Sequence, residues 1–163
     1  MKNRFNILFL LLFAGMIVSC VQMEDLNVTA VNKVQMEGVS LSGGTLTVAL
    51  EVENVSRTTL KIKSLEVEVR DEESGKRLCT FDLPEAVTLR PGVNQVEAAI
   101  RMRPEGGMFG LLSLVGRMEK RSDTLAADVR IKLRNGWITS TKRLEGVSLK
   151  GLLDQIGIGE SLF

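Results

Sequence analysis

The chain has 163 residues, of which 21 are basic and 20 acidic, with one Trp, two Cys and no His. This near-neutral charge argues against a nucleic-acid partner, because binding to phosphates requires a basic surplus. The lack of His in the sequence excludes His-based catalytic triads and His-based metal sites, and two Cys are too few for a thiolate cluster. We therefore expect a protein that is not an enzyme and that binds no metal or cofactor.

The first segment has the layout of a secretory signal. Lys2 and Arg4 give it a positive start, and residues 7–18 contain no charge. A helix of a dozen residues is about 18 Å long, whereas a bilayer core requires roughly 20 residues. A short basic region followed by a short apolar region is typical of a signal peptide, which we place at residues 1–19.

Ile17-Val18-Ser19-Cys20 resembles the lipobox of bacterial lipoproteins. In that family the Cys thiol receives diacylglycerol, the peptide is cut just before the Cys, and the new amine is acylated. The resemblance implies lipidation at Cys20 and attachment to a membrane through its acyl chains; the alternative is an uncleaved anchor with an incidental Cys. Because Val21 rather than Asp follows, we expect the outer membrane of a bacterial cell envelope, with the periplasmic face and the cell surface both left open.

Residues 20–32 lack a strong period, so we expect a lipidated tether there and a single domain over residues 33–163. The domain is dominated by alternating apolar and polar residues, a pattern typical of strands with one buried and one solvated face. Most Glu residues fall on the solvated faces, which argues against a catalytic carboxylate pair. We expect an all-β, immunoglobulin-like antiparallel sandwich of about seven strands, in which the clearest strands cover residues 46–52, 65–69, 96–102 and 125–133.

Two local features of these strands lead to specific expectations. The inward-facing parity changes from even to odd between residues 60–62 and 65–69, which predicts a β-bulge near Lys63-Ser64. Asn135-Gly136 is a strong hairpin signal and predicts a two-residue type I′ turn. Trp137 follows this turn directly and is expected to cover one end of the core.

The pentapeptide Glu-Gly-Val-Ser-Leu occurs twice, at residues 37–41 and 145–149. One such pair is not a repeat architecture, and chance accounts for it in a chain rich in Val, Leu and Ser. The structural alternative is that the first and last strands have equivalent roles, including pairing with each other.

The segment from Met108 breaks the alternation and predicts a short apolar helix at about residues 108–120. Phe109 and Leu114 lie outside its main apolar stripe, so the apolar arc is wider than the arc of about 100° that covering a closed sandwich requires. The main stripe consists of Met108, Leu111, Leu112, Val115 and Met118.

The wide apolar arc has three interpretations. The helix is a lid, with Phe109, Leu112 and Val115 lining or covering an apolar groove; or it packs between the sandwich and a partner; or it is sunk deeper into its own core. A further helical turn is expected near the C-terminus, within residues 149–156.

The remaining candidates for chemistry are a thiol and an acidic turn. Cys79 shares strand parity with Phe81 and Leu83, so a buried structural thiol is favoured over a reactive one. Asp71-Glu72-Glu73 is either a weak calcium site or, as we favour, the solvated tip of a hairpin.

Over residues 34–156 the order of these elements resembles the late embryogenesis abundant type 2 family, also called the water-stress and hypersensitive-response domain. Family members usually have Asn-Pro at the end of the second strand, where this chain has Asn54-Val55. The resemblance rests on a Gly-containing first strand at 34–41, a long amphipathic strand ending at Asn54, the strand start Leu60-Lys61-Ile62, and an apolar helix leading into 125–133.

The resemblance implies an immunoglobulin-like sandwich without catalytic residues. It also implies membrane tethering, an association with stress and, as proposed for relatives, lipid held in a groove beside the helix. We therefore expect a non-enzymatic, membrane-anchored envelope lipoprotein whose monomeric domain binds an envelope protein. The alternative is a carrier of a lipid or other apolar ligand in a groove beside residues 108–118.

Overall fold

The computed structural model describes residues 25–40, 42–120 and 122–149. Strands make up most of this part, and the α-helix α2 (Gly107–Lys120) and the short 3-10 helix η1 (Ser122–Thr124) lie between β6 and β7. No helix of these ranges is long and apolar enough to cross a membrane. The strands are β1 (Leu26–Ser40), β2 (Gly43–Asn54), β3 (Leu60–Asp71), β4 (Arg77–Asp82), β5 (Val87–Leu89), β6 (Gly92–Pro104), β7 (Leu125–Asn135) and β8 (Ile138–Ser148).

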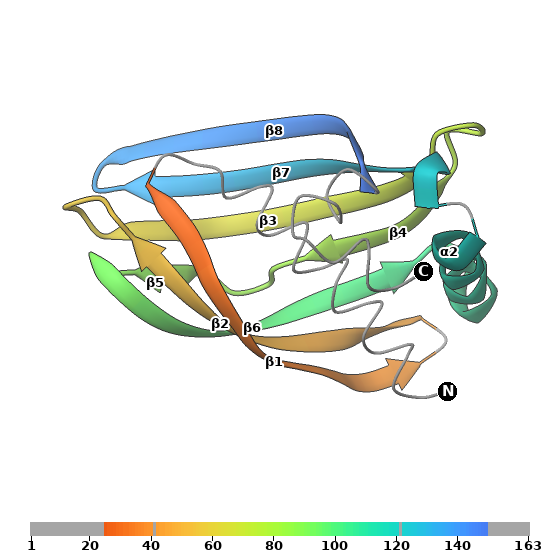
Figure 1. The fold of residues 1–163 in the computed structure, drawn as a ribbon, viewed down its shortest axis with the longest axis horizontal. Helices are drawn as coiled ribbons and strands as arrows, with labels where there is room; N and C mark the ends of the chain where they lie inside the picture. The colour runs from red at the N-terminus through yellow and green to blue at the C-terminus, as the bar shows by residue number, and fades with distance from the viewer. Residues whose placement is uncertain (1–24, 41, 121, 150–163) are drawn as a thin grey trace.

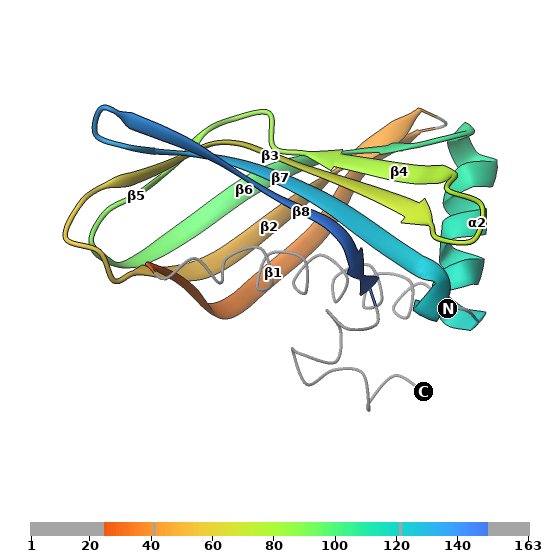
Figure 2. The same ribbon diagram turned by 90° about the horizontal axis from the view of Figure 1, so that it is seen from above.

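Hydrogen bonds join the strands in the order β1-β2-β6-β4-β3-β7-β8, and β5 pairs with β3 beyond the end of β4. Neighbouring strands are antiparallel throughout this order. The sheet folds over so that β1, β2 and β6 form one layer and β3, β7 and β8 the other (Figure 1). Figure 2 shows the strands of the two layers crossing at an angle. The expected all-β antiparallel sandwich is confirmed, with eight strands in the described part rather than about seven.

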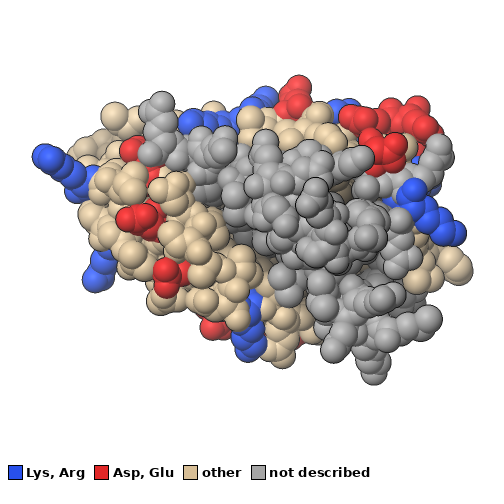
Figure 3. All heavy atoms as spheres, viewed as in Figure 1, with Lys and Arg blue, Asp and Glu red and all other residues tan. Residues whose placement is uncertain are grey.

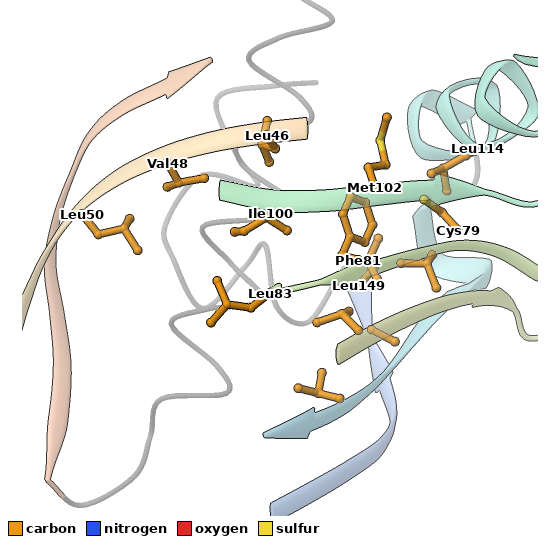
Figure 4. Packing of buried hydrophobic residues seen from close by; sticks show 14 of the residues in the cluster. Leu46, Val48, Leu50, Cys79, Phe81, Leu83, Ile100, Met102, Leu114 and Leu149 are labelled. Atoms are coloured by element: carbon orange, nitrogen blue, oxygen red, sulfur yellow. The ribbon is translucent and has the colours of Figure 1, made fainter. Parts of the chain in front are cut away.

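The core lies between the two layers and follows the alternation read from the sequence. On β2 the even-numbered apolar residues from Leu46 to Val52 are buried, and on β7 the odd-numbered ones from Leu125 to Leu133 are buried. Figure 4 shows Leu50, Leu83 and Ile100 pointing into the space between the layers. Each fully buried aliphatic side chain contributes about 1.5–3 kcal/mol relative to its exposed state, so this alternation supplies the main driving force for the sandwich.

The bulge and the hairpin were predicted with different success. The register of β3 against β7 shifts between Ile62 and Ser64, so the predicted bulge is confirmed. The β7–β8 hairpin exists, but Asn135 pairs with Ile138, which makes Gly136 and Trp137 the two turn residues. Gly136 has φ of +58°, and no described non-Gly residue has a positive φ. The predicted type I′ turn is therefore wrong, because such a turn needs positive φ at both central positions.

The first four residues of each pentapeptide copy lie in the two edge strands, 37–40 in β1 and 145–148 in β8. Gly38 in β1 and Gly146 in β8 both have positive φ, +58° and +62°. In each case the pairing register shifts at the pentapeptide, after Glu37 in β1 and opposite Ala127 in β8. The copies thus build equivalent bulges near the ends of both edge strands. The described parts of β1 and β8 do not pair with each other, because they lie at opposite edges of the sheet order.

The domain begins earlier than the sequence analysis placed it. Residues 26–32, assigned there to the tether, form the first half of β1, and Leu26 is buried in the core. Bulges between Val28 and Ala30 and between Val31 and Lys33 interrupt the alternation of this half-strand. The interrupted pattern explains why its period was not recognised. The helical turn expected within residues 149–156 lies, apart from Leu149, outside the described residues.

Candidate binding site

The sandwich has two chemically different ends. One end, here called the loop end, consists of residues 55–59, 90–91 and 136–137 together with the start of β1. Strand register brings these segments together, because Leu26 pairs with Asn54, Asn54 with Gly92, and Leu60 with both Leu89 and Asn135. The opposite end, here called the helix end, consists of α2 and the β3–β4 turn, residues 72–76. Figures 1 and 2 both show the two ends at opposite extremes of the long axis.

Two of the three predicted lid residues, Phe109 and Leu112, do not line a groove between α2 and the sheet. Phe109 is 85% exposed and Leu112 is 58% exposed, whereas Leu111 and Leu114 are buried. The side chain of Val115 is outside the described part. The helix thus turns Leu114 rather than Leu112 toward the core, so the predicted main stripe is wrong on this point.

Close packing fixes this orientation of α2. Leu114 lies beside Cys79 of β4 and Met102 of β6, as Figure 4 shows. Gly110 permits the helix to sit against the end of β6, because a Cβ there would collide with the carbonyl oxygen of Glu105. The helix is therefore a plug that closes this end of the core.

The loop end contains an apolar cavity of about 60 Å³ between the two layers. This volume is well below the roughly 150 Å³ of an engineered cavity that binds benzene. As it stands, the cavity holds a short stretch of a slender apolar chain and nothing wider. Its lining comes from β1, β2, β3, β5, β6, β7 and the β4–β5 connection and includes Leu26, Leu50, Leu83, Leu89, Ala98 and Ile131.

An open cleft of about 290 Å³ adjoins this cavity at Leu26, which borders both. The cleft lies on the open side of the sandwich, between the start of β1 and the β7–β8 hairpin. Its volume is near the lower bound of about 300 Å³ for small-molecule sites. The residues that line it are Asp25, Leu26, Leu60, Leu133, Asn135, Ile138, Ser140 and Lys142.

Lys142 brings a positive charge to this otherwise largely apolar cleft. It pairs with Ile131 across the β7–β8 ladder and therefore shares the inner face of the sheet. Its side chain is exposed, and no ion pair joins it to another described residue. An inward-facing charge on an edge strand also discourages strand addition by other chains. The cleft therefore offers an apolar floor at Leu26, Leu60 and Leu133. Its lining contains two opposite charges, Lys142 and Asp25, so an amphipathic anion would have to place its acidic group near Lys142 and away from Asp25.

Two Asn side chains hold the loops of this end in place. The buried Asn54 donates through Nδ2 to the carbonyl oxygens of Thr58 and Leu89, at 2.9 and 3.0 Å. Its Oδ1 accepts from the backbone N–H and the hydroxyl of Ser56, at 3.0 and 2.7 Å. Asn94 bonds in the same way to both backbone groups of Arg90. At the loop end the loops are thus held by hydrogen bonds from these two side chains, whereas the helix end is closed by apolar side chains of α2.

The buried ionisable groups of the helix end have structural partners. Asp71 is buried at the end of β3, and its Oδ2 accepts from Ser74 Oγ and Arg117 Nη1, both at 2.6 Å. The Ser74 hydrogen bond, together with the nearby Arg117 guanidinium, holds the pKa of Asp71 below its ordinary value of 3.8. The residues described contain no cluster of His, Cys, Asp and Glu suited to a metal ion. Asp71 thus fastens α2 to the β3–β4 turn.

Cys79 is fully buried in β4, and burial raises the pKa of its thiol to about 12. A thiol with so high a pKa is almost entirely protonated near neutral pH and is a poor nucleophile. The expected structural role of this residue is consistent with that environment. Cys20 lies outside the described residues.

Sequence reasoning missed the residues of the cleft. Leu26, Ile138 and Lys142 are distant in the chain, and only the strand register brings them together. The one signal in the sequence was Lys142, a charged residue at a position of β8 where the alternation places an inward-facing side chain.

No family model matches the chain, and no curated protein matches it. Among solved structures, a protein from Archaeoglobus fulgidus is 12% identical with a TM-score of 0.45, covering 71% of this chain and 91% of that chain. A protein from Arabidopsis thaliana is 15% identical with a TM-score of 0.34, covering 71% of this chain and 79% of that chain. A β-glucuronidase of glycoside hydrolase family 2 is 15% identical with a TM-score of 0.33; the match covers 71% of this chain but 11% of that chain. Such weak similarity defines no function.

Proposed function

We propose that the protein is a lipoprotein of the bacterial cell envelope, anchored in the outer membrane through acyl chains on Cys20, with a sandwich domain related to the late embryogenesis abundant type 2 family. The observation that carries this proposal is the lipobox-like Ile17-Val18-Ser19-Cys20, which lies just before the folded domain. Five residues, 21–25, separate Cys20 from the start of β1. Two or three acyl chains suffice for stable anchoring, so the domain is held close to the bilayer.

The domain acts as a binding module rather than as an enzyme. Support comes from the environments of its buried reactive groups. The Cys79 thiol is protonated and sealed in β4, and the Asp71 carboxylate is bound to Arg117 and Ser74. Both groups contribute to packing at the helix end, away from the cleft. The cleft itself offers shape, the charges of Lys142 and Asp25 and the hydroxyl of Ser140, and in this proposal they bind a ligand rather than break a bond.

The anchoring proposal is tested with a pair of cysteine variants labelled in cells with a clickable fatty acid. Cys20→Ser should lose the label and accumulate as a precursor that keeps its apolar segment. Cys79→Ala, which removes the other thiol of the chain, should keep the label and mature normally. If the Cys20→Ser protein still matures and partitions into detergent like the parent, the anchoring proposal is wrong.

A second candidate function is favoured by the cavity at the loop end. In this second function the domain carries a lipid or another amphipathic ligand. The apolar chain of the ligand would lie between the layers and the acidic group of the ligand near Lys142. This places the ligand at the opposite end of the sandwich from the groove expected beside residues 108–118. The cavity of about 60 Å³ is too small for a whole acyl chain, so binding would require the layers to separate on the open side near Leu26.

Neighbouring alanines on β6 provide a matched test of this candidate. Ala98 faces the cavity and Ala99 is exposed on the opposite face of the strand. Native mass spectrometry of the purified protein, followed by organic extraction, should show bound lipid that Ala98→Leu reduces and Ala99→Leu leaves unchanged. A parent protein that is empty and takes up no fluorescent fatty acid would eliminate the carrier function.

A further inference from the structure

The loop end carries an unusual share of the exposed apolar surface. Seven large apolar side chains are strongly exposed in the described part of the chain, and four of them lie at or beside this end: Val55, Val93, Trp137 and Ile138. Trp137, the single Trp of the chain, is 96% exposed and does not cover the core as the sequence analysis expected. Single exposed apolar residues are ordinary, but a protruding Trp-Ile pair at a hairpin tip is a surface suited to a partner.

Basic side chains surround these apolar residues. Arg57 lies in the β2–β3 loop, Arg90 in the β5–β6 loop, and Arg134 next to the hairpin turn, where its Nε donates to the carbonyl oxygen of Gly136 at 2.8 Å. None of the three forms an ion pair with another described residue. Asp25 and Glu53 are the acidic residues nearby. Figure 3 shows basic groups projecting from the left extremity of the molecule, over the loop end, with acidic groups on the surface beside them and a further acidic cluster at the upper right.

The chain enters the domain at this same end. Leu26 pairs with Asn54, and the N–H of Val55 donates to the carbonyl oxygen of Asp25 at 2.9 Å. Six residue steps join Cys20 to Leu26, and at roughly 3.5 Å per step they reach about 20 Å when fully extended. The 12 residues of β3 extend for about 40 Å at roughly 3.3 Å per residue. The tether therefore keeps the loop end near the bilayer and leaves the helix end free to lie far from it.

We propose that the loop end rests on the membrane surface, with Trp137 and Ile138 inserted among the lipid headgroups and Arg57, Arg90 and Arg134 facing anionic lipid. The inference rests on the proposed anchoring through Cys20. Trp is favoured at membrane interfaces because its ring is apolar and its N–H is polar, and Arg near the surface is attracted to anionic lipid. In this orientation the cleft between β1 and the β7–β8 hairpin, whose lining includes Asp25, Leu60 and Asn135, lies close to the bilayer, so an amphipathic ligand would have a short path between lipid and protein.

The native Trp makes the orientation measurable in the full lipidated protein. The protein is reconstituted into vesicles of phosphatidylcholine and phosphatidylglycerol, with or without bromine on the acyl chains, and recovered by flotation. Brominated lipid should quench the fluorescence of Trp137. The emission maximum of Trp137 in the vesicle-bound protein should lie at a shorter wavelength than the maximum of the same protein in detergent-free buffer. As a matched control, the Trp137→Ser/Phe109→Trp variant moves the reporter to an exposed position at the helix end. Its emission should be unquenched.

Each outcome has a distinct meaning. Floated protein in which Trp137 is unquenched, or in which both reporters are quenched equally, overturns the proposed orientation while leaving the anchor intact. Protein that does not float overturns the anchoring and, with it, this inference. Arg57→Glu/Arg90→Glu should reduce quenching in vesicles that contain phosphatidylglycerol, and undiminished quenching would overturn the role given to the arginines.

Discussion

At the helix end the core is closed by an apolar plug, in which Leu111 and Leu114 of α2 are buried and Asp71 binds Arg117. At the loop end no helix within residues 25–40, 42–120 and 122–149 covers the core, and Asn54 and Asn94 brace the loops through hydrogen bonds to the backbone. The apolar cavity and the adjoining cleft lie at the second end. Polar bracing thus keeps loops ordered without filling the space beneath them, and this leaves room for a ligand.

The contrast gives the two ends different tasks. The helix end supplies stability, because Asp71 Oδ2 binds Ser74 and Arg117 and the apolar plug fills the core. In our proposals the loop end is the functional end. It combines unfilled apolar space, exposed apolar side chains and Arg residues that form no ion pair with another described residue, all next to the start of β1. Variants that affect one end and spare the other therefore test whether the two ends have separate roles.

The largest effect is expected from the plug. Leu114→Ala removes a fully buried side chain and should lower the free energy of unfolding by about 3 kcal/mol, since large-to-small core substitutions leave a cavity. Leu112→Ala, on the exposed side of the same helix, should change it by less than about 0.5 kcal/mol. Urea denaturation measures both values. Equal losses in the two variants would show that the orientation of α2 is wrong.

An intermediate effect is expected from the polar bracing. Asn54→Ala leaves the buried carbonyl group of Leu89 without this donor and also removes the bond to the Thr58 carbonyl, which keeps its bond from Ser56 Oγ. It should cost about 2 kcal/mol, because unsatisfied buried groups are expensive. Asn94→Ala removes similar bonds at a half-buried position that water reaches, so it should cost less. The same denaturation series compares them. An Asn94 variant that is the less stable of the two would contradict this account of the loop end.

The smallest effect is a pH dependence at the helix end. The pKa of Asp71 is lower in the folded protein than its ordinary value of 3.8. Its charged form therefore stabilises the fold above that value, and this contribution is lost as the pH falls through the folded-state pKa. The melting temperature of the parent should exceed that of Asp71→Asn near neutral pH, and the difference should shrink as the pH falls below about 4. A difference that stays constant down to strongly acidic pH would exclude this linkage.

The sequence predicted the sandwich because alternation on strands such as β2 and β7 reflects burial on one face. It failed where a choice depends on tertiary contacts. Leu112 and Leu114 both belong to a wide apolar arc, and packing of α2 against β4 and β6 decides which one is buried. The Asn135-Gly136 signal located the hairpin, but the β7–β8 register shifted the turn to Gly136 and Trp137.

The candidate site was less predictable than the fold. The cleft gathers residues from the start of β1, the end of β7 and the start of β8, and no local pattern records that these segments meet. Bulges in the first half of β1 also concealed its strand character. The lipobox-like motif, by contrast, is a local signal that sequence reading recognises without the fold.

In our proposals a lipid anchor at Cys20 holds the loop end at the membrane. Mass spectrometry of the N-terminal peptide of the membrane-extracted protein tests the anchor most directly. The account predicts that this peptide begins at Cys20, that the Cys20 sulfur carries diacylglycerol and that the new amine carries an acyl chain. A peptide that retains residues before Cys20, or one that begins at an unmodified Cys20, would contradict it.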